Sequence, residues 1–457
     1  MSRTSSGRFP DGFRWGAATA AYQIEGAVAE GGRTASIWDT FAHTPGRVHA
    51  GDTGDVACDH YHRLDEDLDL MSHLGLQDYR FSVSWPRVVP GGSGAPNPAG
   101  LDFYARLVDR LLERGIRPVA TLYHWDLPQE LDDAGGWLNR DTAERFAEYT
   151  AVVAAHLGDR VASFTTLNEP WCSAFLGYAS GEHAPGHRDR ASAFLAAYHL
   201  LTAHGLGTEV LRSVLPGGGD VSVTVNPAVV RAASEADEDV AAADHVDLIA
   251  NRVFLEPLMH GRLPAGLVEA TADVTDWAFV RSEDLARAGE RVDRLGVNYY
   301  SSSVVSAKPG PGGATVFPGS ADVYVLPSRG RTTAMGWQID PDAFVALLVD
   351  LDRAYPGMPI AVTENGAAYP DTTSADGAVR DEARAEYLVE HVGAVRRAIE
   401  AGVDVQAYYV WSLLDNFEWA WGYSQRFGIV HVDFETQRRR IKHSGEVFRR
   451  IVRDGGV

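Results

Sequence analysis

The sequence predicts an α/β protein in which eight strands alternate with helices and close into a single (β/α)8 barrel. Two observations favour this fold. Short β-type runs recur along the chain, and they are separated by segments with the apolar spacing of helices. No low-complexity linker divides the 457 residues, so we expect one domain over residues 1–457.

The predicted strands are eight short runs. Because helical segments separate them, they predict a closed TIM barrel, in which catalytic groups lie at the C-terminal ends of the strands. The runs cover residues 13–16, 78–84, 118–123, 163–167, 221–225, 294–298, 360–363 and 406–410.

The helical pattern is clearest over residues 101–112, where apolar residues recur every three or four positions before Gly115 ends the pattern. A barrel of this kind needs about 250 residues, so long βα loops are expected. The longest, residues 301–340, is rich in Gly and Pro; we expect it to wall a pocket, and a surface excursion is the alternative. Similar spacing predicts helices over residues 60–74, 141–157, 191–214, 240–259, 341–355 and 381–401.

Composition narrows the possible partners and compartments. The formal charge is −21, which disfavours binding to nucleic acid or to an anionic membrane surface. Cys58 and Cys172 are the two cysteines, too few for a disulfide framework, and no run of about 18 apolar residues suggests a membrane span. We expect a cytoplasmic protein with neither a signal peptide nor a membrane span.

Two of the predicted strands end in a glutamate. Glu169 precedes Pro170, which biases it away from the right-handed helical region, and Glu364 precedes the turn signal Asn365-Gly366. A barrel brings the ends of its fourth and seventh strands to one pocket. Glycoside hydrolysis needs two such carboxyl groups, one to protonate the leaving oxygen and one to attack or to activate water. For either glutamate alone, a helix cap or an arginine partner is the alternative.

Motifs around these glutamates resemble glycoside hydrolase family 1, the retaining β-glucosidases. They occur in the order typical of that family, from residue 9 to about residue 433. The motifs are Phe9-Pro-x-x-Phe13-x-Trp15-Gly16, Gln23-Ile-Glu25-Gly26, Asn168-Glu169-Pro170, Thr363-Glu364-Asn365-Gly366 and the segment Trp411–Trp419.

The resemblance implies a role for each matching residue. It implies that Glu169 is the acid/base and Glu364 the nucleophile, that Tyr300 contacts the nucleophile, that Trp411 lies under the sugar ring and that Trp337 lies on the aglycone side. The residues that it implies for binding the non-reducing sugar are Gln23, His124, Asn168, Glu418 and Trp419.

Sugar chemistry supports these residue types independently. A sugar presents hydroxyls that need polar partners and an apolar face that stacks on an aromatic ring. For Trp411 and Trp421, ordinary core packing is the alternative. Asn298 ends the sixth predicted strand, and we expect it to support the site.

Arg80 lies in the second predicted strand and therefore inside the barrel, where a buried arginine needs a carboxylate. We expect it to pair with Glu364. With Tyr300, this pairing would keep Glu364 ionised, and the charge of Glu364 would raise the pKa of Glu169 and keep that residue protonated.

Other candidates for chemistry are weaker. His60 and His62 are two residues apart and would diverge on a helix, so we interpret Asp59-His60-Tyr61-His62 as structural rather than as a metal site. Cys172 follows Glu169 by three residues and could line the pocket, but nothing nearby suggests a cysteine nucleophile. We expect no metal and no organic cofactor.

The sequence therefore predicts a retaining, exo-acting β-glucosidase of cellobiose-like and aryl β-glucosides, with a small β-glucoside or short oligosaccharide as substrate. A 6-phospho-β-glycosidase and a catalytically inactive sugar-binding homologue are the alternatives. Aglycone preference, the ratio of glucosidase to galactosidase or fucosidase activity, and the oligomeric state stay open.

Overall fold

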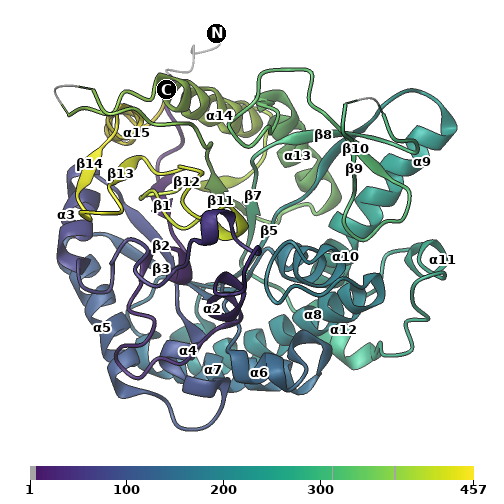
Figure 1. Cartoon of the computed structure of the whole chain (residues 1–457), viewed down its shortest axis with the longest axis horizontal. Helices are drawn as coiled ribbons and strands as arrows, with labels where there is room; N and C mark the ends of the chain where they lie inside the picture. Colours follow the sequence, from purple (N-terminus) through teal and green to yellow (C-terminus); the bar gives the residue numbers. More distant parts are fainter. Residues whose placement is uncertain (1–6, 311, 375–376) are drawn as a thin grey trace.

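The computed structural model describes residues 7–310, 312–374 and 377–457, and its centre is a closed barrel of eight parallel strands surrounded by helices (Figure 1). The barrel closes where Arg14 pairs with Ala407 and Ala18 with Trp411. The predicted fold class is confirmed. Around the barrel the strands are β1 (Arg14–Ala18), β12 (Val405–Trp411), β11 (Ile360–Asn365), β7 (Arg294–Asn298), β5 (Val221–Val225), β4 (Ser163–Asn168), β3 (Arg117–Tyr123) and β2 (Asp78–Ser82).

Amphipathic helices cover the outside of the barrel. The helix predicted over residues 101–112 is α5 (Pro98–Glu113), which buries Phe103, Tyr104 and Leu107 at the expected spacing. It begins with a proline, whose missing N–H would have had no partner in the first turn. The other long helices are α3 (Leu64–Leu74), α7 (Asp141–Leu157), α8 (Arg190–Val214), α13 (Pro341–Ala354), α14 (Glu382–Glu400) and α15 (His443–Asp454).

Two predicted helices differ from the structure. The helix expected over residues 60–74 begins only at Leu64, because Asp59 takes a left-handed backbone conformation and residues 60–62 form a turn. The helix expected over residues 240–259 is divided into α9 (Asp237–Val246), a π-helical turn η6 (Asp247–Arg252) and α10 (Val253–His260). Pro257 lies inside α10 and has no N–H to continue an α-helical ladder.

The long segment 301–340 contains strands of its own. β8 (Ser302–Ser306), β10 (Tyr324–Leu326) and β9 (Thr315–Val316) join β6 (Val229–Ala232) in a four-stranded sheet beside the barrel. Residues of this segment, including Phe317 and Trp337, line a cavity at the C-terminal ends of the barrel strands. The predicted wall is therefore present, and a small sheet supports it.

The remaining elements are short and connect the barrel strands to their helices. No helix in the described ranges is long and apolar enough to cross a bilayer. These elements are α1 (Ala21–Ile24), α2 (Ile37–Ala42), α4 (Trp85–Val88), α6 (Gln129–Asp133), α11 (Leu267–Ala270), α12 (Ser282–Ala288), β13 (Val430–Val432), β14 (Arg439–Ile441), η1 (His49–Gly51), η2 (Pro90–Gly92), η3 (Gly136–Leu138), η4 (Cys172–Ser180), η5 (Pro216–Gly218) and η7 (Trp419–Trp421).

The N-terminal end of the barrel holds a buried carboxylate. Asp78, at the start of β2, accepts hydrogen bonds from Arg14 Nε at 3.0 Å, Arg117 Nε at 3.1 Å and Tyr409 Oη at 2.9 Å. These donors come from β1, β3 and β12, so the cluster joins four strands around one charge. Because two guanidinium groups compensate that charge, we assign this end a structural role.

Candidate active site

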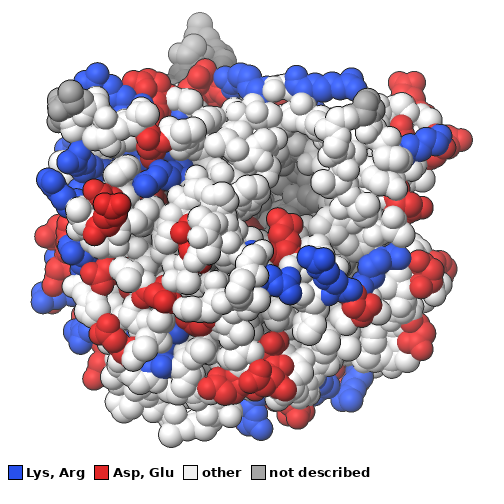
Figure 2. All heavy atoms as spheres, in the orientation of Figure 1, with Lys and Arg blue, Asp and Glu red and all other residues white. Residues whose placement is uncertain are grey.

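The C-terminal ends of the barrel strands open into a cavity of about 350 Å³. Figure 2 shows a hollow near the middle of this face of the molecule. Of the residues predicted for the site, Gln23, Asn168 and Arg80 are buried next to the cavity and do not form its wall. The predicted residues that line it are His124, Glu169, Asn298, Tyr300, Trp337, Glu364, Trp411, Glu418 and Trp419.

Irregular backbone positions both strand-end glutamates. Glu169 directly follows β4 and has φ 46°, so it avoids the right-handed helical region that the following proline disfavours. Glu364 lies within β11, whose register against β7 shifts between Val362 and Glu364. Such bulges re-aim side chains at barrel rims, and a positive φ at a bulky residue stores strain that the surroundings must hold. Both features turn a carboxyl group toward the cavity.

Glu364 is held by two donors from different strands. Arg80 Nη1 donates to Oε1 at 2.7 Å, and the Tyr300 hydroxyl donates to Oε2 at 2.6 Å. The predicted ion pair with Arg80 is confirmed, and neither side chain is more than 4% exposed. Burial raises the pKa of Glu364, and the positive charge of Arg80 and the Tyr300 hydrogen bond act against that rise.

Glu169 has no arginine of its own among the described residues. Asn298 Nδ2 donates to its Oε1 at 2.7 Å, and the Cys172 thiol donates to its Oε2 at 3.1 Å. Burial, and then the charge of Glu364, raise the pKa of Glu169 to about 8. The sequence predicts the charge of Glu364 as the cause of this rise, whereas the larger cause in the structure is burial. Glu169 therefore keeps its proton at neutral pH.

The position of the proton on His124 follows from its neighbours. Asn168 Oδ1 accepts from Arg80 Nη2 at 2.7 Å and from Asn298 Nδ2 at 3.1 Å, so the amide nitrogen of Asn168 faces His124 Nε2, at 3.1 Å. Burial, and then Arg80, lower the pKa of His124 well below its usual value, so the ring is neutral. Nε2 must then accept, and Nδ1 carries the hydrogen. Nδ1 is buried and has no hydrogen-bond partner among the described residues.

Gln23 and Glu418 lie beside each other at the cavity. Gln23 Nε2 donates to Phe417 O at 2.8 Å and contacts Glu418 Oε2 at 3.4 Å, which leaves Gln23 Oε1 buried and without a partner in the described ranges. Burial, and then the charges of Glu364 and Glu169, raise the pKa of Glu418 to about 8. Acceptors and a donor thus remain available for the hydroxyls of a ligand.

Aromatic rings fix the shape of the cavity. Trp419 packs on Trp125 with ring centroids 4.6 Å apart, and His124 stacks on Trp411 at 5.9 Å. Trp411 is 3% exposed and also lines the cavity, so its ring packs in the core and contributes to the cavity wall. Trp421 is 43% exposed and lines the mouth, so it is not a core residue.

Several lining residues were not predicted from the sequence. Asn226 directly follows β5, so the strand-end rule that identified Glu169 would also have identified it. Cys172 lines the cavity, as its position three residues after Glu169 suggests. Phe317 and Met335 come from the long excursion, where no periodic signal marked them. Further unpredicted residues that line the cavity include Trp125, Trp171, Glu182, His183 and Phe427.

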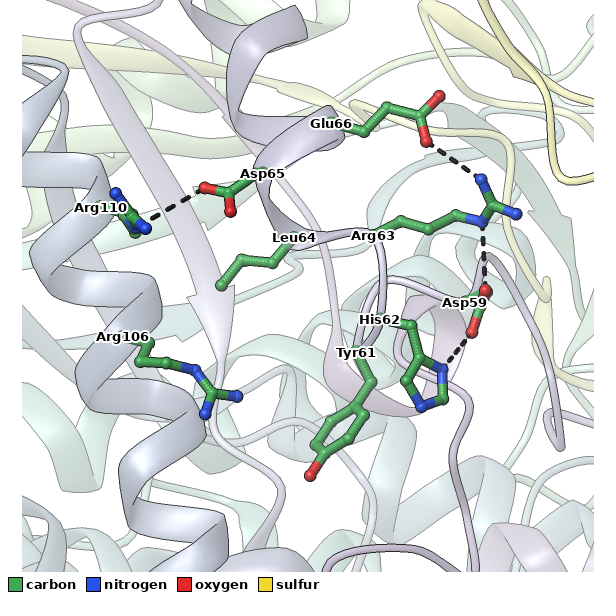
Figure 3. A pocket seen from close by; sticks show the side chains of 9 residues that line it. All are labelled: Asp59, Tyr61, His62, Arg63, Leu64, Asp65, Glu66, Arg106 and Arg110. Carbon is green, nitrogen blue, oxygen red and sulfur yellow. Dashed lines mark hydrogen bonds and ion pairs between the residues drawn. The ribbon is translucent and has the colours of Figure 1, made fainter.

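A second cavity, of about 540 Å³, lies outside the barrel beside α3 and α5 (Figure 3). Arg63 contacts Asp59 and Glu66, and Arg110 lies 3.7 Å from Asp65, so most of its charges neutralise one another. This cavity offers no pair of buried carboxyl groups.

The two histidines of the 59–62 segment have different partners. His60 is buried and bonded to Asp67 at 2.7 Å, and the exposed His62 is bonded to Asp59 at 2.6 Å. In the described ranges, no three His, Cys, Asp or Glu side chains are grouped as metal ligands would be. Independence from metals stays a prediction.

Comparisons with known proteins identify the family of this chain. A family model described as glycosyl hydrolase family 1 matches residues 5–457. The bifunctional beta-D-glucosidase/beta-D-fucosidase of Bifidobacterium breve is 52% identical, over 98% of this chain and 98% of that protein. The solved family 1 b-glucosidase from Thermotoga maritima superposes with a TM-score of 0.94 at 44% identity, over 99% of this chain and 100% of the other. The structure of the same enzyme in complex with isofagomine lactam superposes with a TM-score of 0.93 at 44% identity, over 98% of this chain and 99% of the other.

The fold and the matches define an enzyme of the glycoside hydrolase class. This chain belongs to glycosyl hydrolase family 1. The family predicted from the sequence motifs is therefore confirmed.

Proposed function

We propose that this enzyme hydrolyses β-D-glucosides with retention, using Glu364 as the nucleophile and Glu169 as the acid/base. The observation that carries this assignment is the unlike surroundings of the two buried glutamates. Glu364 is paired with Arg80, whereas Glu169 has neutral donors and a pKa of about 8. An acid and a nucleophile need unlike surroundings, a neutral one that keeps a proton and a cationic one that favours the carboxylate. The predicted activity on β-glucosides, exo-acting and with retention, is confirmed at the level of the family and its relatives.

In the first step, a Glu364 carboxylate oxygen forms a bond to the anomeric carbon while the glycosidic C–O bond breaks. Glu169 gives its proton to the departing oxygen. The products are an α-linked glycosyl ester on Glu364 and a free aglycone alcohol. Arg80 and Tyr300 hold the attacking carboxylate in place, because they bond to its two oxygens from fixed positions on β2 and just beyond β7.

In the second step, water takes the place of the aglycone. Glu169, now a carboxylate, accepts a proton from water as the water oxygen bonds to the anomeric carbon and the ester bond to Glu364 breaks. Esterified Glu364 carries no charge, so one of the causes that raise the pKa of Glu169 is absent at this stage. Two inversions give a β-configured product.

The buried polar atoms around the cavity suit a terminal sugar. We propose that His124 Nδ1 donates to one hydroxyl and that Gln23 Oε1 and the Glu418 carboxyl accept from others, with Asn168 and Asn298 holding this set in place. Trp411 and Trp419 would offer their faces to the apolar side of the ring. Trp337 is half-buried, and its ring centroid lies 5.5 Å from that of Tyr300; it would contact the aglycone.

Two alternatives have less support. A 6-phospho-sugar needs a cation, and the described residues that line the cavity include no Lys or Arg. Arg426, the nearest candidate in the sequence, donates to Asp415 at 2.7 Å. A catalytically inactive sugar-binding protein is disfavoured because both glutamates face one cavity with their supporting partners.

A product analysis and a substrate panel test the proposal. Nuclear magnetic resonance at early times should show β-glucose as the first product from p-nitrophenyl β-glucoside, and α-glucose would overturn retention. The panel compares the glucoside with the galactoside, the fucoside and the 6-phosphoglucoside. The fucoside is included because the Bifidobacterium breve relative is named for both activities.

The physiological setting is also part of the proposal. We propose that the whole chain acts as one catalytic domain on small β-glucosides or short oligosaccharides in the cytoplasm, independently of nucleic acid and membranes. The two cysteines are free and buried, which suits a reducing compartment. Cell fractionation with an antibody would test the location.

A further inference from the structure

The acid/base has a sulfur neighbour that the reaction outlined above does not use. Cys172 lies in the first turn of η4, three residues after Glu169, and is 6% exposed. Its Sγ lies 3.1 Å from Glu169 Oε2 and accepts a hydrogen bond from Asn226 Nδ2 at 3.2 Å. The thiol is therefore fixed on both sides, by the acid/base carboxyl and by a residue at the end of β5.

The chemistry of the thiol determines the direction of its bond to Glu169. Burial, and then the negative charge of Glu169, raise the pKa of Cys172 well above its usual value, so the sulfur keeps its hydrogen. Asn226 supplies a hydrogen to sulfur, so the S–H hydrogen is free to point at Glu169 Oε2. Asn298 points an N–H at the other oxygen. Each carboxyl oxygen thus receives one donor, which suits an ionised carboxylate.

We propose that Cys172 is a positioning residue for the acid/base, whose thiol stabilises the carboxylate form of Glu169 and thereby sets the pH range of both catalytic steps. This inference rests on the proposed role of Glu169. The thiol transfers no proton and forms no covalent bond. It acts as a donor in the first step, when the carboxylate appears, and in the second, when that carboxylate accepts a proton from water.

Other charges act on Glu169 from the surrounding elements. Glu364 on β11 raises its pKa, and Arg80 on β2 lowers it. Tyr300 and Glu418 also interact with Glu169, and burial raises the pKa of each of them. The positions of these groups do not depend on Cys172 through any hydrogen bond described above, so replacing the thiol changes one interaction of Glu169.

Replacing the thiol with an apolar side chain should therefore move the pH profile. In Cys172→Ala and in the similarly sized Cys172→Val, the alkaline limb of kcat/KM for p-nitrophenyl β-glucoside should shift up by about half a pH unit, because an apolar side chain no longer favours the ionised form. With 2,4-dinitrophenyl β-glucoside, whose leaving group needs little acid assistance, the acidic limb of kcat should shift in the same direction, since Glu169 then acts as the base.

Two control variants isolate the hydrogen bond. Cys172→Ser keeps a donor and should restore both limbs to within about 0.2 pH units of the unmodified enzyme. Cys58→Ala removes the other buried thiol, which donates to Asp415 O instead, and should leave both limbs in place. Thermal unfolding of each variant confirms that folded enzyme is compared.

The outcomes separate this inference from the proposed function. Unmoved limbs in both Cys172→Ala and Cys172→Val, or an equal shift in Cys172→Ser, would overturn the role of the thiol, whatever happens to the rate. A Glu169→Ala enzyme that keeps the alkaline limb would instead overturn the assignment of the acid/base. A purely structural role for Cys172 would lower the rate at every pH and leave the limbs unmoved.

Discussion

The two ends of the barrel differ in how far arginines compensate their buried carboxyl groups. At the N-terminal end, one carboxylate, Asp78, receives hydrogen bonds from two arginines and a tyrosine. At the C-terminal end, three carboxyl groups, those of Glu169, Glu364 and Glu418, face one cavity, and among the described residues only Glu364 pairs with a guanidinium. Strand β2 contributes to both arrangements, with Asp78 at its start and Arg80 two residues further on.

The difference between the ends lies in charge compensation. A carboxylate with two cations in contact is stabilised as an ion and joins the strands that carry the cations. Carboxyl groups that share one cation cannot all ionise at neutral pH, and Glu169 and Glu418 have pKa values of about 8. The compensated end stabilises the barrel, and the uncompensated end holds protons for chemistry.

The largest effect should follow from removing the compensated carboxylate of the cavity. Glu364→Ala loses the group that bonds to the anomeric carbon, so kcat for p-nitrophenyl β-glucoside should fall about 10⁴-fold or more. Azide should enter from the side that Glu364 occupied and give the α-glucosyl azide. In Glu169→Ala, azide should attack the glycosyl-enzyme and give the β-azide. A β-azide from both variants would contradict the assignment of Glu364.

Much of this contrast could be predicted from the sequence. The run 163–167 and the polar residues after it placed Glu169 at a strand end, and the buried Arg80 required a carboxylate. The strand predicted over residues 360–363 runs on through Glu364 to Asn365, past a β-bulge after Val362. Such a bulge has no periodic signal.

Other features of the site depend on tertiary packing. Burial is the largest cause of the raised pKa of Glu169, and burial depends on the completed cavity. Phe317 and Trp337 reach the cavity because β8 pairs with β6, whose residues are about 70 positions earlier in the chain. Local patterns carry no information on such a pairing.

The second prediction tests the uncompensated end with an anionic substrate. We expect at least a hundredfold preference in kcat/KM for the glucoside over its 6-phosphate, which corresponds to about 3 kcal/mol at 1.4 kcal/mol per tenfold. Glu418 has a pKa of about 8, so it is mainly neutral below pH 8 and ionised above it. The preference for the unphosphorylated glucoside should therefore increase as the pH rises through 8, because the phosphate is then repelled by the ionised Glu418 carboxylate as well.

Glu418→Ser provides the matched variant for this prediction. It should lower kcat/KM for the unphosphorylated glucoside and reduce the ratio of kcat/KM between this substrate and its 6-phosphate. The increase of that ratio above pH 8 should disappear. The ratio of the two substrates is measured on one enzyme, so the titration of Glu169 cancels. Equal hydrolysis of both substrates by the unmodified enzyme would favour a 6-phospho-β-glycosidase.

The third prediction concerns the compensated end. Asp78→Asn removes the charge between Arg14 and Arg117, whose side chains are 30% and 42% exposed and so stay partly hydrated. We expect the free energy of unfolding to fall by about 2–3 kcal/mol, below the cost of breaking a fully buried pair. Chemical denaturation measures this change, and kcat of the folded enzyme should stay within about twofold. A large loss of kcat at unchanged stability would mean that this end takes part in catalysis.

The smallest expected effect is at the mouth of the cavity, where a carboxylate is neither compensated nor deeply buried. Glu182 lines the mouth and is exposed, and it has no ion-pair partner among the described residues. Its charge should favour a cationic aglycone over an anionic one, so Glu182→Gln should reduce the ratio of kcat/KM between 4-(aminomethyl)phenyl and 4-carboxyphenyl β-glucosides. The reduction should be about threefold, because exposed charge pairs contribute roughly 0.2–1 kcal/mol each, and 0.5 M NaCl should abolish most of it.

Glu113→Gln, on the outer surface of α5, carries the same change of net charge and should leave the ratio unaltered. An equal change in both variants would assign the effect to net charge, and a salt-independent change in Glu182→Gln would assign it to shape; either result would remove Glu182 from the determinants of aglycone selectivity.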